Sequence, residues 1–410
     1  MSTSIRLKLS FMMFLEFFIW GAWFVTLGTF LIQNLQASQF EIANVFSTQS
    51  LGAIIAPFII GMIADRYFNA ERILGILHLV GAFLMYQMYN STNIDVFYPY
   101  VLSYMILYMP TLSLVNSVSF RQLTNPEKEF SNIRIFGTIG WIIAGLSISY
   151  IFKWDSTEGA LRNTFLMSGV ASLVLGLFSF VLPKTPPVKI SADEKPSFAS
   201  IIGLDAIKLL KDKNFLVFFI SSILICIPLA FYYQNANPFL AEIGLANPTG
   251  KMTIGQISEV GFLLLLPVFF SKFGFKKTIL VGMLAWAVRY LLFAYGNAGD
   301  LSFMLILGIA LHGICYDFFF VSGQIYTDSK AGVKYKSAAQ GLITLATYGV
   351  GQLIGFWVAG FIGEKYQSIK ATDVAGFWQQ TWIVPAGIAL VVMILFMIFF
   401  KDEKVESKTV

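Results

Sequence analysis

Charged side chains are scarce in this chain of 410 residues. Asp, Glu, Lys and Arg make up 12% of it, about half of the roughly 25% found in an average soluble domain. Hydrophobic residues make up 57% and aromatic residues 16%, which is more apolar surface than the core of a water-soluble fold can bury. We therefore expect lipid to cover most of the exterior.

Sequence features of several other protein classes are also missing. The two cysteines, Cys226 and Cys315, lie inside apolar runs, so we expect neither a disulfide framework nor a zinc site. No cluster of His and Cys suggests a metal, and no phosphate-binding glycine loop suggests an ATP-driven pump. The net charge of +5 comes from basic residues between apolar segments and does not imply a nucleic-acid partner. We expect no cofactor and an ion gradient as the energy source.

Apolar stretches of about 20 residues, the length of a membrane-spanning helix, recur along the whole chain. The first follows Arg6 and Lys8 but has no small-residue cleavage site, so we interpret it as a retained helix. The sequence predicts an all-α membrane protein of the inner membrane. Its twelve transmembrane helices are expected at 9–33, 42–62, 73–90, 97–118, 134–152, 163–182, 214–241, 254–271, 277–295, 302–327, 336–361 and 378–400.

Basic residues indicate the orientation of the chain, because the cytoplasmic side of a membrane protein retains positive charge. The loops and termini on one side of the predicted helices carry 21 Lys and Arg, and the opposite loops carry five. Both termini are therefore predicted to be cytoplasmic. A connection rich in Pro and Lys near the middle suggests two halves. The predicted parts are an N-terminal six-helix bundle (1–182), a cytoplasmic linker (183–213), a C-terminal six-helix bundle (214–400) and a tail (401–410).

Small residues recur in the fifth and eleventh predicted helices. Gly137 and Gly140 lie in the first of these, and Gly341 and Gly349 lie in the second. This weak repeat supports two pseudo-symmetric halves. We favour close helix packing as the role of these glycines, with sliding surfaces for alternating access as the second explanation.

Several ionisable side chains interrupt the apolar segments, although such a group at mid-bilayer costs on the order of 2.5–3.5 kcal/mol. They are Glu16, Arg134, Glu259, Arg289, His312 and Asp317, with His78 as a less certain case. Gln256 and Glu259 are three residues apart and share a helical face, where an amide and a carboxylate can grip vicinal hydroxyls. The alternative is a buried structural pair. Arg289 lies near the end of its predicted helix, which favours a structural role.

A second group lies in the tenth predicted helix. His312 and Tyr316 are four residues apart on one face, and Asp317 is next to Tyr316. Burial disfavours the charged form of a carboxyl group and a nearby guanidinium favours it. Asp317 or Glu259 is therefore a candidate for proton coupling, through an arginine that approaches and leaves. A static salt bridge is the alternative.

Arg134, Thr138 and Trp141 follow one face of the fifth predicted helix. A cation, a hydroxyl and a large aromatic ring in one stripe suit stacking on a base and pairing with a carboxylate. An interfacial arginine whose head group reaches the membrane surface is the alternative.

Several segments resemble the nucleoside:proton symporter family of the major facilitator superfamily along nearly the whole chain. They are Phe18-Ile19-Trp20-Gly21-Ala22-Trp23, Thr26-Leu27-Gly28, Ala64-Asp65-Arg66, Tyr108-Met109-Pro110-Thr111-Leu112, Ile133-Arg134-Ile135-Phe136-Gly137-Thr138-Ile139-Gly140, Gly203-Leu204-Asp205-Ala206, Gln256-Ile257-Ser258-Glu259, Tyr316-Asp317-Phe318-Phe319 and Ser337-Ala338-Ala339-Gln340-Gly341. Together they are specific, whereas Asp65-Arg66 alone indicates only the superfamily.

The resemblance implies a carrier whose central cavity holds a ribonucleoside, with carboxylates that take part in substrate binding and proton coupling. The candidate substrate-binding residues are Arg134, Thr138, Trp141, Tyr233, Gln234, Gln256, Glu259, His312, Tyr316 and Asp317. Among them Glu259, Asp317 and Arg134 are the candidates for proton coupling. The expected partners are a nucleoside, protons and the lipid bilayer, and the protein is expected to be a monomer.

Some positions depart from the family pattern. Ala230 and Tyr233 occupy the places of two amides on the seventh helix, although Gln234 follows. His312 stands where the family has a tyrosine, and Tyr316 where it has a phenylalanine. These differences predict altered base recognition. A proton-coupled sugar or polyol carrier is the alternative function, and a receptor or intramembrane enzyme is a third, although no nucleophile with a base is visible.

Overall fold

The computed structural model describes residues 2–59, 68–124, 126–186 and 204–401. The chain forms two compact units, Met1–Pro196 and Ser197–Val410, and each is described here by itself. Most of the predicted linker, the Ala64-Asp65-Arg66 segment and nearly all of the predicted tail lie outside the described residues.

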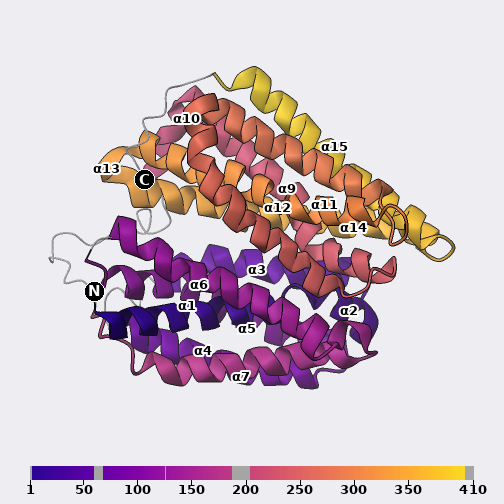
Figure 1. The fold of residues 1–410 in the computed structure, drawn as a ribbon, viewed down its shortest axis with the longest axis horizontal. Helices are drawn as coiled ribbons and strands as arrows, with labels where there is room; N and C mark the ends of the chain where they lie inside the picture. The colour runs from indigo at the N-terminus through magenta and orange to yellow at the C-terminus, as the bar shows by residue number, and fades with distance from the viewer. Residues whose placement is uncertain (1, 60–67, 125, 187–203, 402–410) are drawn as a thin grey trace. The chain divides into compact units, whose positions relative to one another are not determined.

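The N-terminal unit is all helical (Figure 1). Helix α1 packs along α6, α4 along α7, and α3 along α5. The helices are α1 (Thr3–Trp23), α2 (Leu27–Leu35), α3 (Gln39–Ile59), α4 (Ala70–Asn90), α5 (Ile94–Phe120), α6 (Pro126–Leu146) and α7 (Asn163–Ser179), with a π-helix at Ser147–Ile151 and 3₁₀ turns at Trp154–Ser156 and Ala160–Arg162.

Polar residues at helix ends explain several of these boundaries. Ser2 begins α1 by accepting the Ile5 amide, and Asn93 begins α5 by accepting the Val96 amide. The first predicted membrane helix is interrupted by a turn between α1 and α2, so it is not one continuous helix. Gln36 ends α2 in the left-handed conformation.

The C-terminal unit is also helical, and the broken helix α10 packs against α15, α11 and α12. Helix α9 packs against α14 and α15. The helices are α9 (Lys213–Glu242), α10 (Pro248–Tyr295), α11 (Ser302–Ala310), α12 (His312–Tyr316), α13 (Ser322–Thr344), α14 (Gln352–Lys370) and α15 (Val374–Phe399), with π-helices at Asp317–Val321 and Leu345–Gly351 and a 3₁₀ helix at Leu204–Lys211.

Helix α10 holds two of the predicted membrane helices. Its 48 residues would extend about 72 Å as one straight helix, more than twice the roughly 30 Å hydrocarbon core. Gly274 breaks it with φ 74° and ψ 176°, a conformation open almost only to glycine. Gly332 breaks α13 in the same way. Both breaks lie between segments that the sequence predicts as separate membrane helices.

Ten helical segments of the described chain are long and apolar enough to cross a membrane. This set counts α1 with α2 as one segment and the whole of α10 as one segment. It does not include α3, whose predicted helix continues to residue 62, beyond the last described residue of this stretch. The all-helical membrane architecture is therefore confirmed, and the number twelve stays a prediction.

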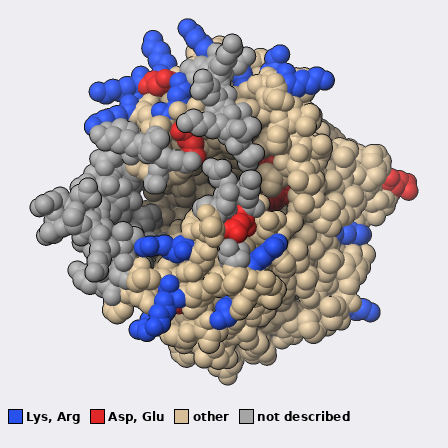
Figure 2. Space-filling view, turned by 60° about the vertical axis from the view of Figure 1, so that its left-hand side comes forward, with Lys and Arg blue, Asp and Glu red and all other residues tan. Residues whose placement is uncertain are grey.

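Basic side chains gather at one end of each unit. In the N-terminal unit, Lys8 at the start of α1 donates to the carbonyl of Val181 beyond the end of α7, at 2.9 Å. In the C-terminal unit, Asn214 at the start of α9 donates to the carbonyl of Lys401 beyond the end of α15. Figure 2 shows Lys and Arg side chains on the face that it views.

Glycines bring α6 and α1 into direct contact. A Cβ on Gly137 would lie 2.6 Å from both Phe17 and the Arg134 guanidinium, and a Cβ on Gly140 would overlap the carbonyl oxygen of Phe14. These two positions therefore serve helix packing. Gly341 differs, because nothing in the described structure lies within 4 Å of a Cβ placed there.

Candidate functional site

A buried arginine organises the polar interior of the C-terminal unit. Arg289 of α10 is fully buried, and its guanidinium carbon lies 3.5 Å from the centroid of the Tyr232 ring of α9. Its Nη1 lies 3.2 Å from Nδ1 of His312. Stacking on an aromatic face stabilises a desolvated guanidinium, and the planar head group can still donate hydrogen bonds from its edge.

This contact determines the tautomer of His312. Arginine only donates hydrogen bonds, so Nδ1 of the imidazole accepts and carries no hydrogen. The ring hydrogen is then on Nε2, which lies 3.8 Å from Oε2 of Glu259. His312 is buried, whereas the Glu259 side chain is 26% exposed. The three side chains therefore form a series in which Arg289 donates to His312, and Nε2–H of His312 lies near Glu259 at more than hydrogen-bond distance.

Asp317 lies close to this series. It is 1% exposed, its Oδ2 has no hydrogen-bond partner among the described residues, and it interacts electrostatically with Glu259. It begins the π-helix Asp317–Val321, and such helical irregularities are frequent at functional sites. Two carboxyl groups thus share one buried region, and the presence of a proton on one of them changes the cost of charge on the other.

Two tyrosines are paired beside His312. The Tyr316 hydroxyl lies 3.0 Å from that of Tyr348, and either can be the donor. Tyr348 belongs to the second π-helix, Leu345–Gly351. The Tyr316 ring also stacks on His312, with centroids 5.9 Å apart. This stacking confirms the shared face that the sequence spacing predicts.

A glycine allows α10 and α12 to approach closely enough to form this region. The Gly313 amide donates to Oγ of Ser258 at 3.1 Å. A Cβ on Gly313 would lie 2.6 Å from the Ser258 carbonyl and 2.7 Å from the Glu259 amide nitrogen. Any side chain at 313 would therefore push Glu259 away from His312 and Asp317.

The amides and the other aromatic candidate lie on α9 and α10. Gln234 is fully buried, and neither its Oε1 nor its Nε2 has a partner among the described residues. A buried amide in that state is costly and is suited to receive a polar group of a ligand. Tyr233 and Gln256 are both partly buried, and Gln256 is one turn before Glu259.

In the N-terminal unit, α6 carries the three predicted residues Arg134, Thr138 and Trp141, all partly buried. The Arg134 guanidinium carbon lies 4.0 Å from the centroid of the Phe17 ring. Trp141 packs edge-on against Trp20, with centroids 5.5 Å apart. The predicted stripe on this helix therefore exists, and aromatic rings of α1 support it.

Two contributors to the C-terminal region, Tyr232 and Tyr348, were not predicted from the sequence. Arg289, for which the sequence favoured a structural role, is fully buried. Arg289 contacts the His312 imidazole, and an arginine that approaches and leaves Asp317 or Glu259 stays a prediction. The sequence indicates Arg289 because it is a charged residue inside an apolar segment. It does not reveal which side chains contact the guanidinium.

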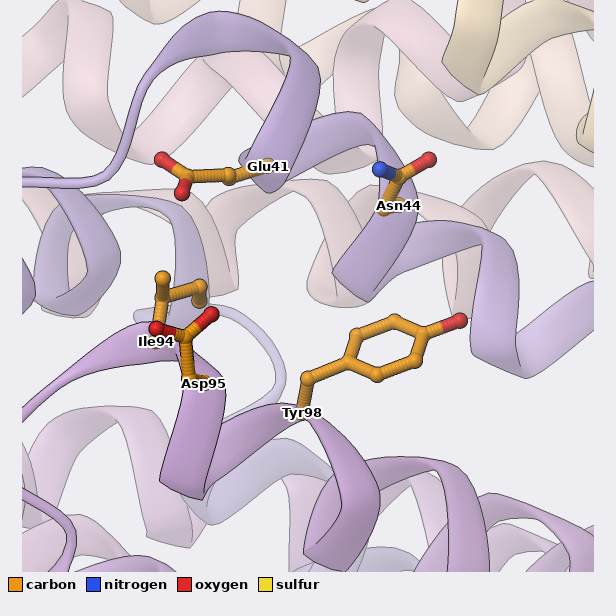
Figure 3. A pocket seen from close by; sticks show the side chains of 5 residues that line it. All are labelled: Glu41, Asn44, Ile94, Asp95 and Tyr98. Atoms are coloured by element: carbon orange, nitrogen blue, oxygen red, sulfur yellow. The ribbon is translucent and has the colours of Figure 1, made fainter.

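Two surface pockets in the described part of the chain lie elsewhere, and none of the predicted site residues lines either of them. One of about 220 Å³ lies between the starts of α3 and α5, where Figure 3 shows Glu41 and Asn44 across from Asp95 and Tyr98. Another, of about 540 Å³, lies between the ends of α9 and α10 and the start of α15. Neither adjoins Glu259, His312 or Asp317.

Comparison with known proteins identifies the family of this helical chain. The family model described as "Nucleoside H+ symporter" matches residues 1–405. The chain belongs to the nucleoside H⁺ symporter family. Among curated members, it is 42% identical to the putative nucleoside transporter YegT of Escherichia coli K12, over 97% of this chain and 94% of that protein. It is 33% identical to the xanthosine permease of the same organism, over 99% of both chains.

Solved structures agree with this family assignment. A crystal structure of the nucleoside transporter NupG superimposes with a TM-score of 0.86 at 30% identity, over 98% of this chain and 100% of that chain. The peptide-family transporter PepTSo, at 15% identity and a TM-score of 0.75, shares the fold alone. The resemblance stated from the sequence is confirmed.

This symporter is therefore a transporter with the major facilitator fold, not an enzyme. Membership of the family makes it a multi-pass protein of the bacterial inner membrane that moves nucleosides together with protons. The intramembrane-enzyme reading is thereby excluded.

Proposed function

We propose that nucleoside and proton meet at the polar region around Glu259, His312 and Asp317. The observation that supports this most strongly is a buried carboxyl oxygen of Asp317 without a partner, next to the Arg289, His312 and Glu259 series. In this proposal Asp317 and Glu259 hold the coupled proton. The amide of Gln256 and the carboxylate of Glu259 form hydrogen bonds with the ribose hydroxyls.

The base is recognised by stacking and by an amide. Trp141 offers an aromatic face, and Arg134 offers a cation about two turns away on the same face of α6. Gln234 presents one donor and one acceptor, which match the paired donor and acceptor at the edge of a nucleobase. Thr138, Tyr233 and Tyr316 complete the proposed binding residues.

Coupling follows from the cost of charge in lipid. A carboxylate carried through the bilayer without a proton costs on the order of 2.5–3.5 kcal/mol, which slows a conformational change roughly 100-fold. Protonation of Asp317 removes that cost when a nucleoside is bound. The loaded carrier then reorients and releases both into the cell, and the proton, which moves down its own gradient, drives the entry of the nucleoside.

We further propose twelve membrane helices with both termini in the cytoplasm. The break at Gly274 divides α10 into two membrane helices, and α3 adds one more to the ten segments. The basic ends of the units then face the cytoplasm. The proposed parts remain 1–182, 183–213, 214–400 and 401–410, and the proposed carrier is a monomer.

Proteoliposomes with an imposed pH gradient test this proposal. We expect wild type to accumulate labelled nucleoside, and a protonophore or Asp317→Asn to abolish accumulation. Glu364→Gln is the matched control, because Glu364 is an exposed carboxylate of α14. If the accumulation of nucleoside does not depend on the pH gradient, the proposed coupling of nucleoside to proton transport is wrong.

Competition decides the substrate class. Unlabelled nucleosides should displace the labelled substrate, and sugars should not. Displacement by sugars alone would establish the polyol alternative. Binding without exchange across the liposome membrane would instead indicate a receptor.

A further inference from the structure

A second buried pair of ionisable groups lies in the N-terminal unit, and neither member is among the residues assigned above. Glu16 of α1 is fully buried, and its Oε2 lies 2.9 Å from Nε2 of His78 on α4. His78 is itself 2% exposed. Burial of a carboxyl group and an imidazole inside a membrane protein costs free energy, and ionisable groups kept at such positions usually have a function.

The hydrogen bonds around His78 fit two protonation states. Oγ of Ser172, on α7, lies 3.0 Å from Nδ1 of His78 and 2.9 Å from the His78 carbonyl oxygen. A serine hydroxyl has one hydrogen and can also accept. Its hydrogen therefore points either to the carbonyl, with Nδ1–H donating to Oγ, or to Nδ1 itself.

These two orientations differ by one proton. When the Ser172 hydroxyl donates to the carbonyl, Nδ1 carries a hydrogen, and one further proton lies between Nε2 and the Glu16 carboxyl oxygen. The pair then has no net charge. When Ser172 donates to Nδ1, Nε2–H donates to a Glu16 carboxylate, and the pair carries one negative charge. In both states Nδ1, Nε2 and Oε2 each have a hydrogen-bond partner, and the imidazole ring does not have to move.

Glu16 keeps its other contacts in both states. Oγ1 of Thr111, on α5, lies 2.6 Å from Oε1 of Glu16. The Tyr108 hydroxyl donates to the backbone carbonyl of Glu16 at 2.8 Å. The Tyr108 bond fixes the backbone at Glu16, and the Thr111 contact is to Oε1 and not to Oε2, where the proton is exchanged. Oγ1 of Thr111 also lies 2.6 Å from the Tyr108 carbonyl, so its one hydrogen has two possible acceptors.

Other titratable groups surround the pair. Tyr104 and Tyr108 of α5 both interact electrostatically with Glu16, and phenols are neutral near pH 7. From α6, the Arg134 guanidinium lies over Phe17, the residue after Glu16, and it interacts with Tyr108. Arg134 therefore supplies a positive charge near the pair, and α7 contributes only the neutral Ser172.

We propose that Glu16 and His78 form a proton-binding site in the N-terminal unit, which takes up and releases one proton as the Ser172 hydroxyl rotates. This site deepens the proposed function, on which it rests, by adding a proton-binding group outside the carboxyl region of the C-terminal unit. Because both side chains are sealed from water here, the proton exchanges only in another conformation of the unit. Coupling requires such conformation-dependent access.

Simultaneous measurement of nucleoside and proton movement tests the site. Proteoliposomes that contain a pH-sensitive dye report protons, and labelled nucleoside reports substrate. We expect Glu16→Gln, which keeps the side-chain shape but cannot titrate, to move fewer protons per nucleoside than wild type. Glu41→Gln is the matched control, because Glu41 caps α3 of the same unit through Ser38.

If folded Glu16→Gln moves as many protons per nucleoside as wild type, the proposal of this site is wrong and the proposed function is unaffected. Wild type that moves nucleoside without protons would refute the proposed function, and the site with it. The two failures are therefore distinguishable.

A milder variant covers the case in which Glu16→Gln does not fold. Ser172→Ala removes the acceptor of Nδ1–H. The form of the pair with the extra proton loses more stability than the form without it, because its imidazole carries more positive charge. We expect the pH of half-maximal uptake to move lower. Ser168→Ala is the control, because Ser168 is equally buried on α7 but donates to the Ile19 carbonyl. An unchanged pH profile in Ser172→Ala would overturn the proposal.

Discussion

Nη1 of Arg289 lies 3.2 Å from Nδ1 of His312, and this contact directs the imidazole N–H toward Glu259. A guanidinium without hydrogen-bond acceptors of its own makes the direction unambiguous. Arg289, for which a position near the end of its predicted helix favoured a structural role, thus orients the histidine in the polar region. Its replacement is the most informative single change in the C-terminal unit.

Arg289→Lys should weaken nucleoside binding by roughly 10-fold or more. Lysine keeps the charge but cannot stack its head group on Tyr232 and donate to His312 at once, and a hydrogen bond to a charged group contributes about 1.5–3 kcal/mol. Equilibrium binding of labelled nucleoside measures the effect. Tyr232→Phe keeps the aromatic ring and serves as the control. Full affinity in Arg289→Lys would show that the stack has no role in binding.

Gly313→Ala should abolish transport and lower the melting temperature. The added Cβ would contact the Ser258 carbonyl and separate α10 from α12, and forced overpacking costs about 1–3 kcal/mol. Gly261→Ala is the matched control on α10, because nothing described lies within 4 Å of its Cβ. Thermal unfolding and uptake should be compared for both variants. If the two behave alike, the close approach at Gly313 is not what positions Glu259.

Asp212→Asn should destabilise the protein at neutral pH but not in acid. Partial burial alone would raise the pKa of Asp212, but the Phe215 and Asn214 amides and Lys330 lower it below its usual value. A lowered pKa contributes stability above the unfolded pKa, and that stability is lost as the pH falls through the folded pKa.

The Asp212 effect should be small, at most about 1 kcal/mol, because the side chain is 42% exposed. Asparagine also caps helices well, so the difference isolates the charge. Melting temperatures across an acid titration measure it. A difference between variant and wild type that persists at low pH would contradict this explanation.

Labelling of introduced cysteines should report the orientation of the chain. Lys211→Cys, before α9, should be protected from an impermeant maleimide in intact cells, whereas Asp300→Cys, after α10, should react. Both native cysteines are buried, which keeps the background low. After lysis, both variants should react. The reverse pattern in intact cells would invert the proposed topology.

Composition and hydropathy alone determined that this is a helical membrane protein, because apolar runs of that length have no other stable environment. The motifs also determined the family, which its full-length match confirms. Spacing placed His312 and Tyr316 on one face, since a helix repeats every 3.6 residues. These inferences rest on local periodicity, which a sequence contains directly.

Only the tertiary structure decided which polar groups meet. Arg289 and His312 are on different helices, as are Glu16 and His78, so no spacing rule connects them. The turn between α1 and α2 likewise divides a segment that the sequence predicts as one helix, whereas the break at Gly274 lies between two helices that the sequence already separates. Contacts between distant segments follow from packing, and packing depends on side chains that are far apart in the chain.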